Sequence, residues 1–432
     1  MAKMKITIHR GINQIGGCIT GIESASGTKI LIDLGHNLPD AEGPVEDEYD
    51  VPENLDRLLD GVSAVFYTHY HGDHIAFEAA VAERGVDQYL GYLAKKVKQK
   101  FYAHMQNIPV DSLKQKYKSA FQAVGGFKEY GADMPVTVGD IKITPYYVSH
   151  SAADAYMFVI ECDGKKILHT GDFRDHGYLG KYLKGVLSKF IARKSIDVLI
   201  TEGTMLSRND VRMMSEDELQ QKAYELMSGY KYTFVLCSST DPDRLASFYQ
   251  ATRHQGRPFI ADGYQCKLLE TFTKFTKQLK RNYRIYDFTG AFKYDETLWQ
   301  DMMDTGFTMV VRNSDKFRGW MDELMPLLPK EETVFIYSQF KGYILTEHTA
   351  YSASTDSFVH SHDWNLEYLH TSGHASRDAL AMVCNTVNPT SAIIPIHREK
   401  GSDFTSLDIS EELKDRVVTS DTTIDDIEIR VQ

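Results

Sequence analysis

The sequence of 432 residues has no run of about eighteen apolar residues, the length that a membrane-spanning helix requires. Its N-terminus, Met1-Ala2-Lys3-Met4-Lys5, leads straight into an expected strand and lacks the apolar stretch of a secretory signal peptide. These two absences predict a cytoplasmic protein without a membrane partner. Internal repeats and low-complexity segments are absent too.

Cysteine is scarce, with five residues at scattered positions and no pair in a CxxC arrangement. This pattern predicts reduced thiols buried as small apolar side chains rather than a disulfide framework. An excess of positive charge is also missing, because the formal net charge is −12. The acidic balance excludes a surface coated uniformly for nucleic acid, but it leaves room for a local basic groove.

The chain is longer than one ordinary domain, and its pattern changes twice. Residues 1–205 are predicted to form short strands around a helical stretch from about 77 to 122. From 206 to 349 helix and strand alternate, which is typical of a mainly parallel sheet and indicates an inserted domain. Residues 350–432 return to the earlier pattern, so they are predicted to complete the first domain.

Positive charge gathers at helical spacing in two stretches, residues 95–100 and 274–284. A solvated helix face is the usual explanation for such a run, and contact with phosphate groups is the alternative. The sequence leaves both interpretations open.

A cluster of potential metal ligands follows the apolar run Val62 to Tyr67, which predicts a buried strand. The run continues as Thr68-His69-Tyr70-His71-Gly72-Asp73-His74. In extended backbone the rings of His69 and His71 project to the same side, and the glycine that follows lets Asp73 and His74 turn back towards them. Imidazole suits zinc, and a carboxylate can serve a second ion. The stretch therefore predicts a metal site at the end of a strand.

Further residues of metal-binding type end other expected strands. They are Asp33, His150, Asp172, Glu202, His374 and His397. A sheet that places its functional residues on one rim would gather all of these side chains around the cluster at residues 69–74. Asp33 could instead form a local Asx-turn, but we favour its lying beneath the metal site, where it would accept a hydrogen bond from a ligand ring.

The order His69-x-His71-x-Asp73-His74, then His150 and Asp172, resembles the signature of the metallo-β-lactamase superfamily. Glu202 in Thr-Glu-Gly-Thr, His374 in Ser-Gly-His-Ala and His397 in Pro-Ile-His resemble the extra motifs of its β-CASP nuclease branch. The N-terminal Gly11 to Gly17 and the Ser-Gly-His-Ala form are most similar to bacterial ribonuclease J. The resemblance implies an α/β fold, a metallo-β-lactamase αββα sandwich with an inserted α/β β-CASP domain, without the C-terminal domain of ribonuclease J.

The resemblance also implies a site with two zinc ions, with manganese as an alternative metal. One ion would be bound by His69, His71 and His150, and the other by Asp73, His74 and His397, with Asp172 shared between them. Asp73, His374 and Glu202 would carry the catalysis, with His374 acting on the leaving oxygen and Glu202 orienting its ring. The sequence departs from the family at Gly72, where glutamate is usual, and at Thr204-Met205.

A pocket for a 5′-phosphate is the remaining implication of the resemblance. Its counterparts here would be Ser238 or Ser239 with His370 and Ser372. The first two precede an expected helix, whose N-terminus favours anions. Asp241 and Asp243 lie close by and would repel a phosphate, and serines that only cap the helix are the alternative explanation.

The implied function is that of an RNA phosphodiesterase that leaves 5′-phosphate and 3′-hydroxyl ends, acting as an endonuclease, a 5′-to-3′ exonuclease or both. His397 stands where DNA-directed relatives carry valine, which favours RNA as the substrate. A small-molecule hydrolase of lactones, thioesters or β-lactams is the first alternative. A DNA nuclease and a non-catalytic nucleic-acid-binding protein are less favoured. A homodimer stays open, and protein partners are not indicated.

Overall fold

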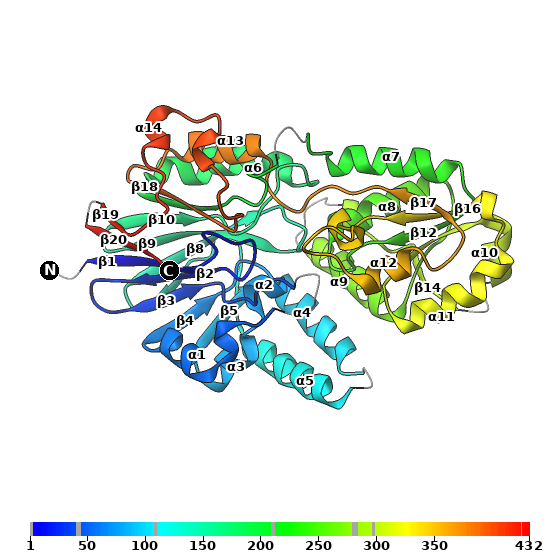
Figure 1. Ribbon diagram of the computed structural model, residues 1–432, viewed down its shortest axis with the longest axis horizontal. Coiled ribbons are helices and arrows are strands. Elements are labelled where there is room, and N and C mark those ends of the chain that lie inside the picture. The colour runs from blue at the N-terminus through cyan, green and yellow to red at the C-terminus, as the bar shows by residue number, and fades with distance from the viewer. Residues whose placement is uncertain are drawn as a thin grey trace.

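The structure is a computed structural model that describes residues 3–39, 45–107, 110–208, 212–278, 284–295, 299–424 and 426–432. Its strands form one sheet of eight and two sheets of six. In Figure 1 the first two sheets stack in the left-hand lobe, and the third builds the right-hand lobe. The N- and C-termini both lie on the left-hand lobe.

The eight-stranded sheet has the order β19-β20-β1-β2-β3-β4-β5-β6. Its strands are β1 (Met4–Arg10), β2 (Ile19–Glu23), β3 (Lys29–Ile32), β4 (Val62–Phe66), β5 (Asp87–Gly91), β6 (Lys128–Tyr130), β19 (Thr422–Ile424) and β20 (Ile427–Val431). Strand β1 alternates buried and half-buried residues, as expected of a strand with one face in a core. Strand β4 pairs in parallel with both β3 and β5, so the ends of these strands share one rim.

The second sheet has the order β18-β11-β10-β9-β8-β7. Its strands are β7 (Val136–Val138), β8 (Ile141–Val148), β9 (Ala155–Cys162), β10 (Lys165–His169), β11 (Val198–Glu202) and β18 (Ala392–Ile396). Asp163 and Gly164, with φ of 51° and 75°, form the tight turn between β9 and β10 that their sequence predicts.

An apolar core fills the space between these two sheets, with isoleucines from β1, β8, β9 and β18 among its members. Helices α1 (Pro52–Leu59), α3 (Glu78–Glu83), α4 (Tyr92–Met105) and α5 (Asp111–Gly126) pack on the outer side of the first sheet. Helices α6 (Leu183–Val186), α13 (Arg377–Val387) and α14 (Glu411–Lys414) cover the second. The predicted αββα sandwich is therefore confirmed. None of the described helices combines the length and the apolarity needed to cross a membrane.

The third sheet has the order β14-β13-β15-β12-β16-β17, and all its pairings among the described residues are parallel, as the alternating pattern predicts. Its strands are β12 (Tyr232–Leu236), β13 (Phe259–Ala261), β14 (Ala291–Lys293), β15 (Phe307–Val311), β16 (Thr333–Tyr337) and β17 (Asn365–Tyr368). Because β17 joins this sheet, the sheet extends beyond residue 349, where the inserted domain was expected to end.

Helices cover both faces of the third sheet. They are α7 (Glu216–Ser228), α8 (Pro242–His254) and α9 (Gly263–Gln278) on one face, and α10 (Trp299–Thr305), α11 (Asp315–Leu324) and α12 (Ala353–Val359) on the other. Apolar residues of α7, α8 and α9 belong to the same core cluster as those of α3, α4 and α5. The two lobes therefore share a continuous apolar core, which fixes the position of one against the other.

The helical stretch expected from about residue 77 to 122 is wrong in its middle, because β5 interrupts it. The strand is five residues long and lies between β4 and β6. A run this short between two amphipathic helices carries too little periodicity to be distinguished from a helix. Between residues 136 and 148 the chain forms two strands, β7 and β8, which a turn at Gly139 separates.

Within the described residues, the basic stretches lie on α4 and α9, and several of their lysines have partners within the protein. Lys95 of α4 pairs with Glu129 at 3.2 Å, and Lys98 is buried. Lys274 of α9 pairs with Glu270. Lys280 and Arg281 of the second stretch lie outside the described residues. These pairings favour the interpretation as ordinary helix faces.

Candidate metal centre

The segment with four potential ligands lies at the end of β4, where the chain turns into the short helix α2 (Gly72–Ile75). Leu34 donates its backbone N–H to the carbonyl of His74 at 2.8 Å, so the loop after β3 holds the segment in place. A Cβ on Gly35 would lie 1.9 Å from the carbonyl carbon of Asp73. Only glycine allows the two loops to approach this closely.

The three histidines predicted for the first cation lie together. The Nε2 atoms of His69 and His150 are 3.1 Å and 3.2 Å from Nδ1 of His71. Nδ1 of His150 donates to the carbonyl of Gly373 at 2.7 Å, which leaves its Nε2 free to act as a ligand. Burial and the neighbouring imidazoles hold the pKa of His69 well below its ordinary value, and burial lowers that of His71 to about 4. The rings are therefore neutral at pH 7, the form that binds a metal.

The donors predicted for the second cation also lie together. Nε2 of His397 is 3.2 Å from Oδ2 of Asp73, and Nε2 of His74 is 3.6 Å from the same oxygen. Oδ2 of Asp172 is 3.2 Å from Nε2 of His74 and 3.5 Å from Nε2 of His397. In each of these donor groups, and in one that joins Asp172 to His69 and His74, the ligand atoms lie within 4.8 Å of one another. Asp172 is thus placed between the two groups.

One buried atom of this centre fits a metal ion better than it fits the protein alone. Nε2 of His74 is buried, and no hydrogen bond to it forms within the described ranges. Burial alone would lower the pKa of His74, but the carboxylates of Asp172, Asp73 and Asp33 outweigh it and raise that pKa well above its ordinary value. An electron-rich pocket of this kind, with nitrogen and oxygen donors, suits a divalent cation.

Asp33 and His397 both adopt left-handed backbone, with φ of 60° and 50°. Such conformations cost energy in residues other than glycine and persist only where the surrounding structure imposes them. Asp33 faces Nδ1 of His74 at 2.8 Å and accepts the backbone N–H and the hydroxyl of Thr68 at 2.7 and 2.8 Å. Asp33 is therefore placed to fix the ring of His74, because β3 and β4 are neighbours.

His374 lies beside Asp172, where its Nδ1 is 3.6 Å from Oδ2 of that residue and 3.0 Å from Oε2 of Glu202. Glu202 itself is fixed by Oε1, which accepts the backbone N–H of Phe173 at 2.8 Å. Burial alone would lower the pKa of His374, but the nearby carboxylates, Glu202 first, raise it to about 9. The arrangement holds a protonated imidazole at the edge of the donor groups.

The sequence-based interpretation missed the role of Thr204. Its hydroxyl lies 2.7 Å from Nδ1 of His397 and 3.2 Å from Nδ1 of His374, so one side chain contacts both rings. The signal was its position two residues after Glu202, at the end of β11. Threonine at this place was noted only as a departure from the family pattern.

The four residues expected to form a phosphate pocket hydrogen-bond to different partners within the protein. The hydroxyl of Ser238 is 3.0 Å from that of Thr240, and Ser239 accepts a hydrogen bond from Gln265 at 3.1 Å. At the start of α8, the backbone N–H groups donate to the side chain of Asp241, which occupies the N-terminus that a phosphate would need. Helix α8 is thus capped by Asp241 and not by either serine, which the capping alternative had expected.

His370 and Ser372 instead lie on the segment that leads to His374. Nδ1 of His370 accepts a hydrogen bond from the guanidinium of Arg244 at 2.9 Å. Burial and this guanidinium lower the pKa of His370 to about 3. The hydroxyl of Ser372 accepts the backbone N–H of His374 at 3.1 Å, so it helps to hold that histidine.

A buried network of charged residues, which the sequence did not indicate, connects the two lobes beside the metal centre. Its members are Arg174, Glu216, Asp241, Asp243 and Arg244, and we call it the arginine network. Arg174 lies 3.2 Å from Asp241 and 2.9 Å from Asp243, while Arg244 lies 3.1 Å from Glu216. A guanidinium N–H of Arg174 also donates to the carbonyl of Ser372 at 3.4 Å. The network thus holds the segment before His374 against α7 and α8.

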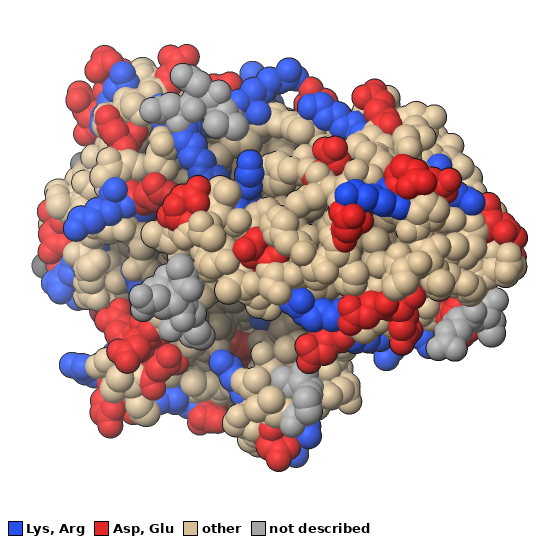
Figure 2. Space-filling view, turned by 45° about the vertical axis from the view of Figure 1, so that its right-hand side comes forward, with Lys and Arg blue, Asp and Glu red and all other residues tan. Residues whose placement is uncertain are grey.

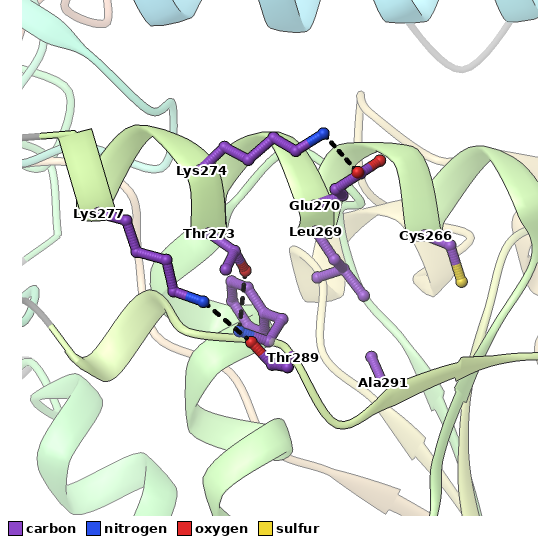
Figure 3. Close-up of a pocket in the computed structure, with 9 residues that line it drawn as sticks. Cys266, Leu269, Glu270, Thr273, Lys274, Lys277, Thr289 and Ala291 are labelled. Carbon is purple, nitrogen blue, oxygen red and sulfur yellow. Dashed lines mark hydrogen bonds and ion pairs between the residues drawn. The ribbon is translucent and has the colours of Figure 1, made fainter.

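Among the described residues, the groups that could hold a metal ion all lie in this one centre. On the face in Figure 2, acidic and basic side chains are interspersed and the middle is largely uncharged. A pocket of about 350 Å³ lies along α9, but the lysines that line it point to Glu270 and Thr289 (Figure 3). None of its lining residues belongs to the donor groups.

Parts of the chain resemble known proteins. Residues 28–228 match the family described as the Beta-lactamase superfamily domain. Ribonuclease J from three strains of Helicobacter pylori is 28% identical over 184 residues, which cover 40% of this chain and 24% of each relative. The match therefore spans about a quarter of the length of these curated relatives.

A solved structure resembles nearly the whole chain. It is a protein of unknown function from Enterococcus faecalis V583, with a TM-score of 0.65 and 17% identity, covering 92% of this chain and 94% of that one. At this identity the likeness concerns the fold alone. The family match concerns residues 28–228, and the two stacked sheets have the metallo-β-lactamase fold. The β-CASP branch and the missing C-terminal domain stay predictions.

Proposed function

We propose that the protein is a two-zinc RNA phosphodiesterase. The observation that carries the proposal is the position of His374, which Glu202 holds 3.6 Å from Asp172 and beside both donor groups. Hydrolysis of a phosphodiester needs stabilised charge on the phosphoryl oxygens and a proton for the leaving oxygen. The donor groups and His374 together offer both.

His69, His71 and His150 would hold one cation, and Asp73, His74 and His397 the other, with Asp172 shared. Two bound divalent cations would supply charge stabilisation and make water more acidic near the phosphorus. Zinc fits the donor set because imidazole nitrogens predominate, and manganese is the alternative because carboxylates contribute.

His374 would act on the leaving oxygen. Its Nδ1 faces Glu202, so its Nε2 is the nitrogen that can donate a proton to the 3′-oxygen as the P–O bond breaks. Glu202 keeps the ring oriented and favours its protonated form. The hydroxyl of Thr204 contacts the rings of both His374 and His397 and so helps to fix their relative positions.

A small-molecule hydrolase on the same fold is the second candidate, since lactones, thioesters and β-lactams also suit a metal centre. A thiolate leaves without a proton donor, so a thioester would leave the His374 and Glu202 pair without a role. The partial similarity to ribonuclease J favours the nuclease as well.

The test compares substrates on the zinc-loaded chain. A labelled oligoribonucleotide carrying a 5′-monophosphate or a 5′-triphosphate, the matching oligodeoxyribonucleotide, nitrocefin and a thioester are each incubated with the protein. Products are resolved by length or colour. We expect cleavage of the RNA, with a mononucleotide ladder if the action is exonucleolytic. Turnover of nitrocefin or the thioester alone would overturn the proposal.

The matched variants are His374→Ala and His360→Ala. His360 is an exposed histidine at the end of α12, so its loss controls for the chemistry of the substitution. We expect His374→Ala to lose about 100- to 10,000-fold in kcat, the range for a proton donor, and His360→Ala to match the parent.

A further inference from the structure

Three aromatic side chains lie partly exposed on the segments that lead to the metal centre: Phe340, Tyr343 and Tyr368, which we call the aromatic platform. Tyr343 is 39% exposed and Tyr368 45% exposed. The rings of Phe340 and Tyr343 are edge to face, with centroids 5.5 Å apart. Large aromatic side chains are usually buried, so their gathering at the surface indicates a binding role.

Two cationic side chains lie over the platform. The guanidinium carbon of Arg208 is 4.9 Å from the centroid of Phe340, and Nζ of Lys341 is 5.6 Å from that of Tyr368. Within the described ranges, neither cation forms an ion pair with a carboxylate. Their charges are thus available for an anion that crosses the rings.

The platform is joined to the metal centre through both chain segments that carry its cations and rings. Tyr368 ends β17 and lies 6.2 Å, ring to ring, from His370, four residues before His374. Arg208 follows the turn at Met205, whose sulfur contacts the hydroxyl of Ser372 at 3.7 Å. The platform therefore borders the segment of residues 370–374 that leads to His374. A strand that crosses the platform therefore reaches the segment that carries His374.

We propose that the aromatic platform stacks the bases of single-stranded RNA, while Arg208 and Lys341 hold its phosphates. The proposal rests on the proposed function and names how that site takes its substrate. Aromatic rings stack on any base, and only an unpaired strand exposes base faces. A duplex hides these faces. The acidic net charge makes a local group of cations the way to hold an anionic chain.

The experiment measures binding separately from cleavage. The full chain, kept in a chelator so that it does not turn over, is titrated into a fluorescent oligoribonucleotide, and the Kd is read from anisotropy. The variants are Tyr343→Ala and Tyr368→Ala, with Tyr343→Phe and Tyr368→Phe as partners that keep the ring. Tyr224→Ala, a 38% exposed tyrosine on α7, is the control. An oligonucleotide of abasic riboses is titrated in parallel.

We expect each alanine variant to raise the Kd for RNA by about 5- to 150-fold, the worth of one stacked base. The phenylalanine variants and Tyr224→Ala should bind as the parent does, and the abasic strand should bind the parent and the alanine variants equally. Parental Kd values for both alanine variants would overturn the platform, as would an abasic strand that loses affinity in parallel with RNA.

The outcomes separate this inference from the proposed function. A parent that binds RNA through the platform but cleaves none when loaded with zinc overturns only the phosphodiesterase. A parent that cleaves RNA while both alanine variants keep its Kd and KM overturns only the platform. A parent that neither binds nor cleaves RNA overturns both.

Discussion

Two buried groups of charged and polar side chains lie side by side, and they differ in how their charges are balanced. In the arginine network, Arg174 and Arg244 face Glu216, Asp241 and Asp243, so the cations come from the protein. In the metal centre, the described ion pairs of Asp73 and Asp172 are all with histidines. The first group is close to complete by itself, and the second has donors that await a cation.

This difference predicts that the arginine network maintains the fold, and that the metal centre carries the proposed chemistry. Burial of ions is expensive and is tolerated only when partners and hydrogen bonds are supplied. The arginine network satisfies this condition with side chains, so its loss should affect folding. The donors of the metal centre would satisfy it with a bound cation, so their loss should affect metal content and rate more than stability.

The largest expected effect breaks the metal centre. His71→Ala removes one of three imidazoles from the first donor group. We expect more than about 100-fold loss of RNA cleavage, because even residues that only orient metal ligands are worth about 10- to 100-fold. Metal content by elemental analysis should fall from two ions per chain towards one. His360→Ala is the control, and a variant that keeps both zinc and rate contradicts the assignment.

The next effect tests the arginine network. Arg174→Ala leaves Asp241 and Asp243 buried without their main cation, which should lower the free energy of unfolding by about 3–5 kcal/mol. Denaturant unfolding of the metal-free protein measures it. Arg212→Ala removes an exposed pair with Glu218 and should cost at most about 1 kcal/mol. If both variants lower the free energy of unfolding equally, the arginine network does not have the special structural role proposed for it.

The features of the fold and of the site that the sequence predicted are those formed by residues close together along the chain. The donors from His69 to His74 fall in one short stretch after a buried strand, so their clustering was predictable. The αββα fold and the strand-end positions of Asp172, Glu202 and His397 were predictable too, because strand patterns and turns are local signals.

What the sequence could not show depends on long-range pairing. Arg174 and Arg244 look like ordinary surface arginines, and only the folded chain brings Glu216 between them. Strand β5 was missed because its neighbours β4 and β6, rather than its own periodicity, define it. The role of Thr204 required both histidine rings to converge on one hydroxyl.

A smaller effect is expected for Asp33, which contacts the ring of His74 without belonging to a donor group. Asp33→Asn keeps the shape of the side chain but weakens its grip on Nδ1 of His74, so zinc affinity should fall by about 10- to 100-fold. Competition with a coloured chelator measures the affinity. Asp50→Asn, which changes an exposed carboxylate near His36, is the matched control and should leave affinity unchanged. Equal affinity in both variants would show that Asp33 is only a turn residue.

The smallest expected effect is a shift in pH dependence. The protonated form of His374 is required of a proton donor, so activity should be lost as the pH rises through its pKa, which the carboxylates raise to about 9. Bound cations repel the imidazolium, so they should lower the pH at which activity is lost. Glu202→Gln removes a negative charge beside His374. The pH at which activity falls should therefore decrease by roughly one to two further units.

The pH–rate profile of Glu202→Gln is compared with that of the parent across pH 6–10. If the alkaline fall in rate occurs at the same pH in both proteins, Glu202 does not control the protonation of His374. Its role would then be limited to its hydrogen bonds with the backbone at Phe173 and Ala375.

Calorimetric titration of the chelated chain with Zn²⁺ tests the central claim most directly, since the claim is that strand ends distant in sequence form two cation sites. The account predicts two zinc ions bound per chain, and one in His71→Ala. Binding of less than one ion by the parent, or the same stoichiometry in parent and variant, would contradict it.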